Sequence, residues 1–289
     1  MTDEVLLEPC GPHILVAKLN RPAARNAVNA AMTQAITVAI ETSEADPAIR
    51  AVILTTTMPE VFCAGADLKE LAAGRGGDLV TAAGGFAGFV RARRAKPWIA
   101  AVAGKALGGG LEFCLACDMV VAGRGASFGL PEVLRGIYAG AGGVFRLPQA
   151  IPRAIAFEMM TTGLPIDAAR AYELGLVNRL VEPDDVLNAA IKLAESISKA
   201  APLAVVETLA LARVANQKSE QELWQLSDEL GARLLKTEDY WEGPRAFTAK
   251  RSPVWKGRQR ERRSRTHYHW RRTIRRSAES GELSLPVAR

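Results

Sequence analysis

Cysteine and long apolar runs are scarce in this sequence, and each scarcity excludes a class of protein. Four cysteines in 289 residues are too few for a disulfide scaffold, so we expect a protein of the reducing cytoplasm. No apolar run approaches the roughly 18 residues that cross a bilayer, so we expect no membrane partner. The opening stretch MTDEVLLEPCG is acidic and lacks the basic and apolar regions of a secretory signal.

Acidic residues are also scarce at the C-terminal end, where residues 258–289 hold ten arginines and three glutamates. The whole chain carries +6, so the first 257 residues carry −1 and the basic character belongs to the tail. The tail has no apolar period and is predicted to be disordered. Such an arm can bind nucleic acid through phosphates, but apart from Tyr268 and Trp270 it lacks aromatics for base stacking, so we expect no nucleic-acid partner.

Short apolar runs typical of buried strands alternate with helical patterns along the chain. A helix is predicted over residues 29–45, between the first two strands, which indicates βα crossovers, a largely parallel sheet and an α/β fold. The predicted strands cover residues 13–19, 51–56, 98–104, 118–123 and 176–182.

After Pro183 the pattern becomes helical, with apolar residues at helical spacing over 186–194 and a second helix at about 203–215. A third helix is predicted to begin at Ser219, where Glu222 completes a capping box. The Gly- and Ala-rich segment 73–89 is interpreted as a mobile loop or a weak helix near the site. We therefore divide the chain into a core with the active site (1–200), a helical oligomerisation region (201–257) and the basic tail (258–289).

Three consecutive glycines, in ALGGGLE (106–112), separate a predicted strand from a helix that starts near Leu111. The free N–H groups at such a helix start can bind a developing negative charge, as in an oxyanion hole. A second turn into a helix, in VFCAGADLKEL (61–71), supplies another free N–H around Ala66 before Asp67. Each turn alone is equally compatible with tight packing of a strand against a helix.

Two glutamates lie in apolar surroundings, Glu112 among Leu111, Phe113 and Leu115, and Glu132 directly after Pro131. Burial raises the pKa of a carboxyl group, and two neighbouring carboxyls can share one proton, which suits acid–base catalysis. Taken singly, each could be an ordinary helix glutamate. The pocket floor is expected to come from residues 73–89 and 137–146.

Five motifs, in this order, resemble the crotonase superfamily, and most closely the enoyl-CoA hydratases, over about residues 5–257. The resemblance implies a spiral of ββα units with a C-terminal helical region that forms a homotrimer, and often a dimer of trimers. The motifs are VFCAGADLKEL, GKALGGGLEFCLACDMVVAG, ASFGLPEVLRGIYAGAGGVFRLP, TTGLPIDAARAYELGLVNRLVEP and EGPRAFTAKRSPVW.

The resemblance also implies an activity, the addition of water to the 2,3 double bond of a 2-enoyl-CoA, as in β-oxidation of fatty or related acyl groups. Ala66 and Gly109 match the oxyanion donors, and Glu112 and Glu132 match the two catalytic glutamates. Coenzyme A is part of the substrate, and neither a cofactor nor a metal is expected. The implied contacts to substrate and CoA are Arg25, Ala27, Ala64, Ala66, Asp67, Leu68, Lys69, Gly109, Phe247 and Lys250.

Two other functions stay open at this point: an enoyl-CoA isomerase of the same fold, and a non-catalytic homologue that binds acyl-CoA or nucleic acid. The presence of both glutamates favours the hydratase. Among the minor motifs, Cys114 and Cys117 are interpreted as small buried side chains rather than a metal or redox pair. RARRAK (91–96) is interpreted as a solvated helix face, or else as a contact to CoA phosphates, and Asp118 as structural.

Overall fold

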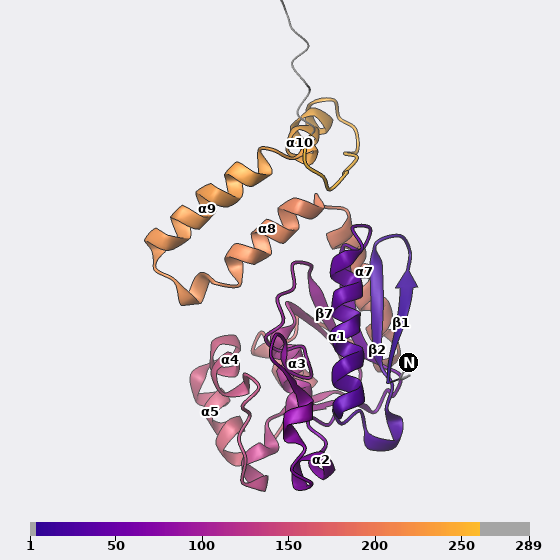
Figure 1. Ribbon diagram of the computed structural model, residues 1–289, viewed down its shortest axis with the longest axis vertical. Coiled ribbons are helices and arrows are strands. Elements are labelled where there is room, and N and C mark those ends of the chain that lie inside the picture. The colour runs from indigo at the N-terminus through magenta and orange to yellow at the C-terminus, as the bar shows by residue number, and fades with distance from the viewer. Residues whose placement is uncertain (1–3, 261–289) are drawn as a thin grey trace, which may run out of the picture.

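The computed structural model describes residues 4–260 and is built around a six-stranded sheet with the order β1-β2-β3-β7-β9-β12 (Figure 1). Only the β1–β2 pair is antiparallel, as the βα pattern predicts. The five predicted strands are confirmed, although the last is shorter than residues 176–182. The strands are β1 (Val5–Cys10), β2 (Ile14–Leu19), β3 (Ala51–Thr56), β7 (Trp98–Val102), β9 (Met119–Gly123) and β12 (Arg179–Val181).

A second sheet of four short strands has the order β11-β10-β8-β4, and β4, β8 and β10 run parallel in it. From β3 onward, three successive turns of the chain place one strand in the large sheet, the next in the small sheet, and then a helix, which is the predicted spiral of ββα units. The elements are β4 (Val61–Cys63), α2 (Leu68–Ala72), β8 (Lys105–Leu107), α3 (Gly109–Ala116), β10 (Ser127–Gly129), a 3-10 helix at Pro131–Arg135, and β11 (Ile166–Asp167).

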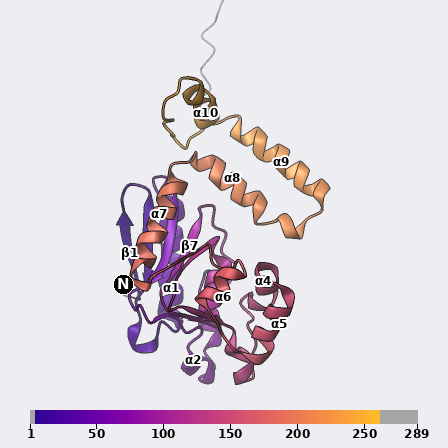
Figure 2. The ribbon, with the colours of Figure 1, turned by 180° about the vertical axis from the view of Figure 1, so that it is seen from behind.

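Two apolar clusters hold these layers together. The larger includes α1 (Ala30–Ala45), α3 and one face of the large sheet, and α1 begins where the Asn29 side chain accepts the Met32 N–H, as the predicted helix 29–45 requires. The smaller lies between the other face of that sheet and α7 (Val186–Ser198), which Figure 2 shows in front of the strands. Further helices α4 (Gly143–Ala150), α5 (Arg153–Thr162) and α6 (Ala168–Glu173) complete the core.

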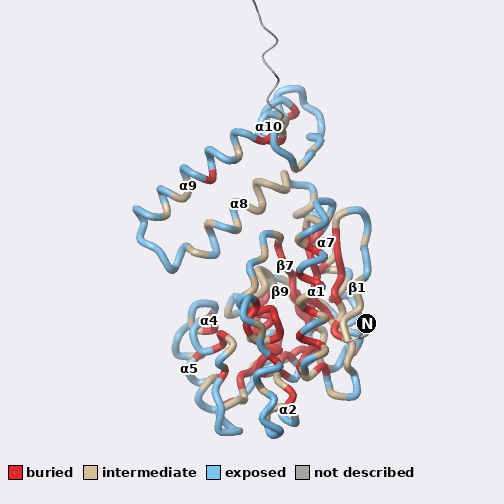
Figure 3. Tube along the Cα trace, in the orientation of Figure 1, coloured by how far each residue is buried: buried red, intermediate tan, exposed pale blue. Residues whose placement is uncertain are grey.

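Three C-terminal helices form an arm that extends away from the core (Figure 1). They are α8 (Pro202–Ala212), α9 (Glu220–Leu234) and α10 (Glu238–Thr248), and the capping box at Ser219 and Glu222 is confirmed. Most of the arm is exposed or half-buried (Figure 3). Helix α8 has no buried residue, although nine of the eleven residues in its sequence PLAVVETLALA are Ala, Val, Leu or Pro. Within residues 4–260, no helix has the length and apolar character to cross a membrane.

The segment 73–89 differs from its interpretation as a loop or weak helix. It contains a 3-10 helix at Gly76–Leu79 and a two-stranded ribbon of β5 (Val80–Thr81) and β6 (Gly85–Phe86). Glycines at φ +65° and +66° (Gly85 and Gly88) allow the tight turns that this ribbon needs. Strand pairing therefore joins Val80 to Phe86 and Thr81 to Gly85 within this segment.

The interpretation of RARRAK (91–96) as a solvated helix face is wrong, because the segment is not helical and Arg94 turns inward. Its guanidinium lies 3.8 Å from the centre of the Phe89 ring and donates to the Ala116 carbonyl at 2.5 Å. The last carbonyls of a helix attract a cation, and Ala116 ends α3. Asp118 is structural, as predicted: it accepts the Trp98 N–H at 2.8 Å and pairs with Arg213.

The basic tail was expected to be disordered from residue 258, and this is wrong for its first three residues. Gln259 pairs with Thr237, the Arg260 N–H donates to the Lys236 carbonyl at 2.7 Å, and Arg258 pairs with Glu238 at 2.7 Å. The rest of the tail, 261–289, lies outside the described residues.

Replacing Asn26 by Ala is expected to destabilise the fold by about 1–3 kcal/mol, because it leaves buried polar groups unpaired. Asn26 is fully buried; its side chain accepts the Arg21 N–H at 2.8 Å and donates to Thr56 Oγ1 at 2.6 Å and to the Phe62 carbonyl at 3.0 Å. Urea unfolding at fixed protein concentration measures the change. Asn188→Ala, at an exposed position of α7, is the matched control. Equal midpoints for the two variants would contradict the assigned role of Asn26.

Candidate functional site

Three segments that follow neighbouring parallel strands meet at one edge of the small sheet. They are residues 64–67 after β4, 108–112 after β8 and 130–132 after β10. The carboxyl ends of parallel strands share an edge, and such an edge is a common place for a ligand site. All three segments line one cavity of about 470 Å³, into which they bring Glu112 and Glu132.

The first two segments touch through glycine backbone. A Cβ on Gly65 would lie 2.9 Å from the Gly109 nitrogen, and a Cβ on Gly110 would lie 2.2 Å from the Cys63 carbonyl oxygen. Side chains at these positions would therefore force the two turns apart. This close approach is the physical reason for glycines at the start of α3.

Two backbone amides of these turns are available to a ligand. Gly109 is the first residue of α3, so its N–H has no acceptor within the helix. The Ala66 N–H has no hydrogen bond recorded among residues 4–260, while its neighbours are held by bonds from the Val28 N–H to the Gly65 carbonyl and from the Asp67 N–H to the Val28 carbonyl. Both Ala66 and Gly109 line the cavity.

Glu112 is almost fully buried, with 3% of its surface exposed. Burial raises the pKa of its carboxyl group from 4.5 to about 7, although the Gly143 N–H, donating to Oε1 at 2.9 Å, favours the charged form. The nearby charge of Glu132 raises the pKa further, and Arg146 lowers it. This carboxyl can therefore gain and lose a proton near neutral pH.

Glu132 lies in the 3-10 helix after β10 and is half-buried. Its Oε1 would lie 3.0 Å from a Cβ on Gly108, so it approaches the glycine turn, and Oε2 is buried with no hydrogen-bond partner among the described residues. Burial raises the pKa of this carboxyl as well. Two carboxyls with raised pKa values beside free amides form an acid–base site that can also bind an oxyanion.

The other predicted contacts fall into two groups. Arg25, Ala27, Ala64 and Leu68 line the cavity together with Ala66 and Gly109. Asp67 instead caps α2, where its side chain accepts the Lys69 N–H at 3.0 Å and pairs with Arg21 at 2.7 Å, while the Lys69 side chain is exposed.

Phe247 lies on α10 and Lys250 two residues after its end. Figure 1 shows α10 at the opposite end of the molecule from α2. Phe247 is 86% exposed, and neither residue lines the glutamate cavity of its own chain.

Sequence reasoning missed several residues of this site. Gly143 supplies the amide that binds Glu112, and Arg146 supplies the nearby positive charge. The glycine pair at the start of α4, in GAGGVF, is a signal that could have revealed Gly143. Phe86 and Tyr138 line the cavity from the two segments expected to form its floor.

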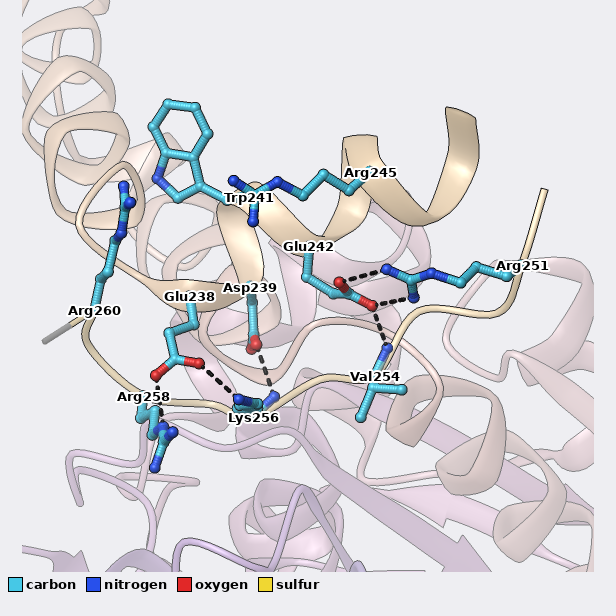
Figure 4. Close-up of a pocket in the computed structure, with 10 residues that line it drawn as sticks. All are labelled: Glu238, Asp239, Trp241, Glu242, Arg245, Arg251, Val254, Lys256, Arg258 and Arg260. Atoms are coloured by element: carbon cyan, nitrogen blue, oxygen red, sulfur yellow. Dashed lines mark hydrogen bonds and ion pairs between the residues drawn. The ribbon is translucent and has the colours of Figure 1, made fainter. Parts of the chain in front are cut away.

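A second cavity, of about 690 Å³, lies in the arm around α10, and Figure 4 shows that its acidic residues are engaged. Glu242 pairs with Arg251 at 2.5 Å, which lowers its pKa to about 2, and Glu238 pairs with Lys256 and Arg258. These carboxylates stay charged at neutral pH, so this cavity lacks the acid–base character of the first.

The cysteine pair has no partner that indicates metal chemistry. Cys114 and Cys117 are free, and burial raises the pKa of Cys117 to about 12. Residues 4–260 contain no group of three or more His, Cys, Asp or Glu side chains placed to hold a metal ion.

Comparison with known proteins gives consistent matches over nearly the whole described chain. The sequence profile described as enoyl-CoA hydratase/isomerase matches residues 11–259. The carnitinyl-CoA dehydratase of Proteus mirabilis is 40% identical over 250 residues, 85% of this chain and 95% of that protein. The mevalonyl-coenzyme A hydratase of Aspergillus fumigatus is 41% identical over 249 residues, 85% and 92% of the two chains.

Solved structures match equally well. An enoyl-CoA hydratase from Mycobacterium marinum superposes with a TM-score of 0.84 at 43% identity, covering 88% of this chain and 99% of that one. A carnitinyl-CoA hydratase from Mycobacterium avium has a TM-score of 0.69 at 44% identity, with 89% and 100% coverage. The fold is therefore that of the crotonase superfamily, as the sequence motifs predicted.

The substitution Glu112→Gln is expected to raise the free energy of unfolding more at pH 8.5 than at pH 5. The folded state keeps the Glu112 proton up to about pH 7, whereas the unfolded chain releases it near 4.5, so the wild type loses stability as the pH rises between these values. The full difference is about 3 kcal/mol, and glutamine removes it. Urea unfolding at both pH values measures it, with Glu158→Gln on exposed α5 surface as control. The same ΔΔG at both pH values would contradict the raised pKa.

Proposed function

The chain belongs to the enoyl-CoA hydratase/isomerase family of the crotonase superfamily, and we propose that it adds water across the 2,3 double bond of a 2-enoyl-CoA thioester. The observation that carries the proposal is the meeting of Glu112 and Glu132 beside Gly109 and Ala66 in one cavity. The family relationship supports a hydratase-type activity on CoA thioesters, and the named substrate and the assignment of residue roles are ours.

The two free amides act first in the proposed mechanism. The N–H groups of Ala66 and Gly109 donate to the thioester oxygen, which withdraws electrons from the β-carbon and stabilises the enolate that forms when water adds there. One well-placed donor of this kind typically contributes about 3–4 kcal/mol to lowering the barrier.

The two glutamates then handle the protons. Glu112 takes a proton from the water molecule as its oxygen bonds to the β-carbon, and Glu132, protonated, delivers its own proton to the α-carbon. The product is the 3-hydroxyacyl thioester, and the proton on Glu112 returns to Glu132 through solvent before the next turnover. A pKa near 7 for Glu112 matches this work, because a base is most effective when its pKa lies near the working pH.

Isomerisation is the main competing reaction in the same fold, and it requires only the transfer of a proton between two carbons. A second carboxyl beside the first, as here, favours addition of water, which needs a base for the water and an acid for the carbon. The relatives named as a dehydratase and a hydratase support the same choice, since dehydration is hydration in reverse. Their acyl groups differ at nearly equal identity, so overall identity does not select the acyl group.

We propose that Arg25, Ala27, Ala64 and Leu68 contact the CoA arm in the cavity, where Asp67 fixes the start of α2 and Lys69 faces solvent. Coenzyme A enters as part of the substrate, and the reaction needs no further cofactor. The four free cysteines suit the reducing cytoplasm, and β-oxidation of fatty or related acyl groups is the matching process.

We propose further that the arm packs on neighbouring copies in a homotrimer that pairs into a dimer of trimers. The apolar helix α8 has no buried residue, and Leu230 is the single buried residue of α9. Apolar helix faces left uncovered in one chain favour burial against another. Assembly would also bring Phe247 and Lys250 of one copy within reach of a neighbour's CoA site.

Replacing Glu112 or Glu132 by Gln is expected to lower kcat for hydration of crotonyl-CoA by about 10²–10⁴-fold each, because glutamine cannot transfer the proton. Loss of the enoyl-thioester absorbance measures the rate. Glu173→Gln, at an exposed position of α6, is the control and should retain the wild-type rate. Full activity in either active-site variant would contradict the mechanism.

The mass in solution is expected to be three or six times the chain mass of 31.0 kDa. Trp224→Lys, on α9 where the indole is 63% exposed, should shift the protein toward single chains, because it places a charge in the proposed interface. Sedimentation velocity measures both. Tyr172→Lys, on the surface of α6 where the side chain is 50% exposed, should leave the trimer intact. A wild-type protein that sediments as a single chain would overturn the assembly.

A further inference from the structure

Phe86, on the short strand β6, stands directly against the backbone that offers an amide to the thioester oxygen. A Cβ on Gly109 would lie 2.5 Å from Cε1 and 2.8 Å from Cζ of the Phe86 ring. The ring also lines the cavity that holds both glutamates. Phe86 is therefore in van der Waals contact with the turn at which the reacting carbonyl is proposed to bind.

The ring is supported from behind by other buried aromatic side chains. Phe86 stacks on Phe113 with centroids 5.9 Å apart, and Phe113 meets the Phe89 ring edge to face at 5.4 Å. Phe89 in turn contacts Trp98 at 5.1 Å and lies under the Arg94 guanidinium at 3.8 Å. Phe113, Phe89 and Trp98 are fully buried, so the Phe86 ring has no space behind it into which to retreat.

The backbone of Phe86 is held as firmly as its ring. Phe86 pairs with Val80 across the β5–β6 ribbon, and the next N–H, of Ala87, donates to the Leu79 carbonyl at 2.8 Å. The Phe86 carbonyl accepts the Phe89 N–H at 3.0 Å, and the Arg91 N–H donates to the Gly84 carbonyl at 2.8 Å. Movement of the backbone that carries the ring would break this set of bonds.

We infer that the Phe86 ring sterically blocks the acyl chain, and that the protein therefore selects short-chain 2-enoyl thioesters over long ones. The inference rests on the proposed function, because it assumes a thioester carbonyl at Ala66 and Gly109. Because the ring lies against Gly109, one of the two residues whose amides are proposed to hold this carbonyl, we expect the acyl chain to meet the ring within its first carbons. A longer chain would then have to displace a ring that the neighbouring aromatic side chains hold in place. Leu71, Ile137 and Ala141 also line the cavity and make its surface suitable for a small apolar group.

The test compares kcat/KM for crotonyl-, 2-hexenoyl- and 2-decenoyl-CoA in wild type, Phe86→Leu and Phe86→Ala. We expect wild type to prefer crotonyl- over decenoyl-CoA by at least about 10-fold, the range that a misfit of one or more methylenes produces in an apolar pocket. The preference should shrink in Phe86→Leu and vanish or reverse in Phe86→Ala. Phe157→Ala, a partly exposed aromatic of α5 that does not line the cavity, should keep the wild-type ratio.

Calorimetric binding of butyryl- and decanoyl-CoA, which cannot react, gives a second readout that does not depend on turnover. A wild-type ratio near 1, or a ratio that Phe86→Ala leaves unchanged, would overturn the inference in either assay. The protein could also fail to hydrate any substrate and still show a binding preference for butyryl-CoA that Phe86→Ala removes. That result would overturn the proposed function and support the steric block by Phe86. Phe86→Leu retains most of the ring's volume, so it serves where Phe86→Ala fails to fold.

Discussion

The contact between the turns after β4 and β8 is the constraint on which the rest of the site depends. Gly65 and Gly110 bring two lengths of backbone so close that a Cβ on either would overlap the other turn. Backbone amides are fixed by the fold, whereas side chains must be ordered at an entropic cost, so donors of this kind are in place before any ligand arrives. The same approach directs α3 inward and so carries Glu112 into the interior.

Burial of two carboxyl groups follows from that geometry and has an energetic cost. Charged carboxylates are poorly solvated there, so the fold keeps protons on them to a higher pH than in solution. The Gly143 amide and the Arg146 charge offset part of this penalty for Glu112. A functional site can thus lower the free energy of unfolding, and burial of the large apolar core around it offsets that loss.

Local patterns in the sequence predicted the frame well and the packing poorly. Apolar runs and caps predicted five of the six strands of the large sheet, the helix after Asn29 and the helix after Ser219, because these depend on neighbours in the chain. Arg94 was misread because a run of charges normally indicates solvent, and only the fold shows that Phe89 and the end of α3 lie beneath it. The ribbon around Phe86 was missed for the same reason, because a glycine-rich segment looks mobile until its cross-strand hydrogen bonds are known.

The residues of the candidate site also divide into those that local sequence patterns predict and those that depend on packing. Ala66, Gly109, Glu112 and Glu132 follow strand ends, so their order and spacing in the sequence already contained the motif, whereas their meeting required the register of β4, β8 and β10. Phe86 and Tyr138 come from connections whose paths no local pattern specifies. Strand ends set the chemistry and connecting segments set the shape of the cavity. A change in the β5–β6 ribbon can therefore alter which acyl group fits without moving a single group that transfers a proton.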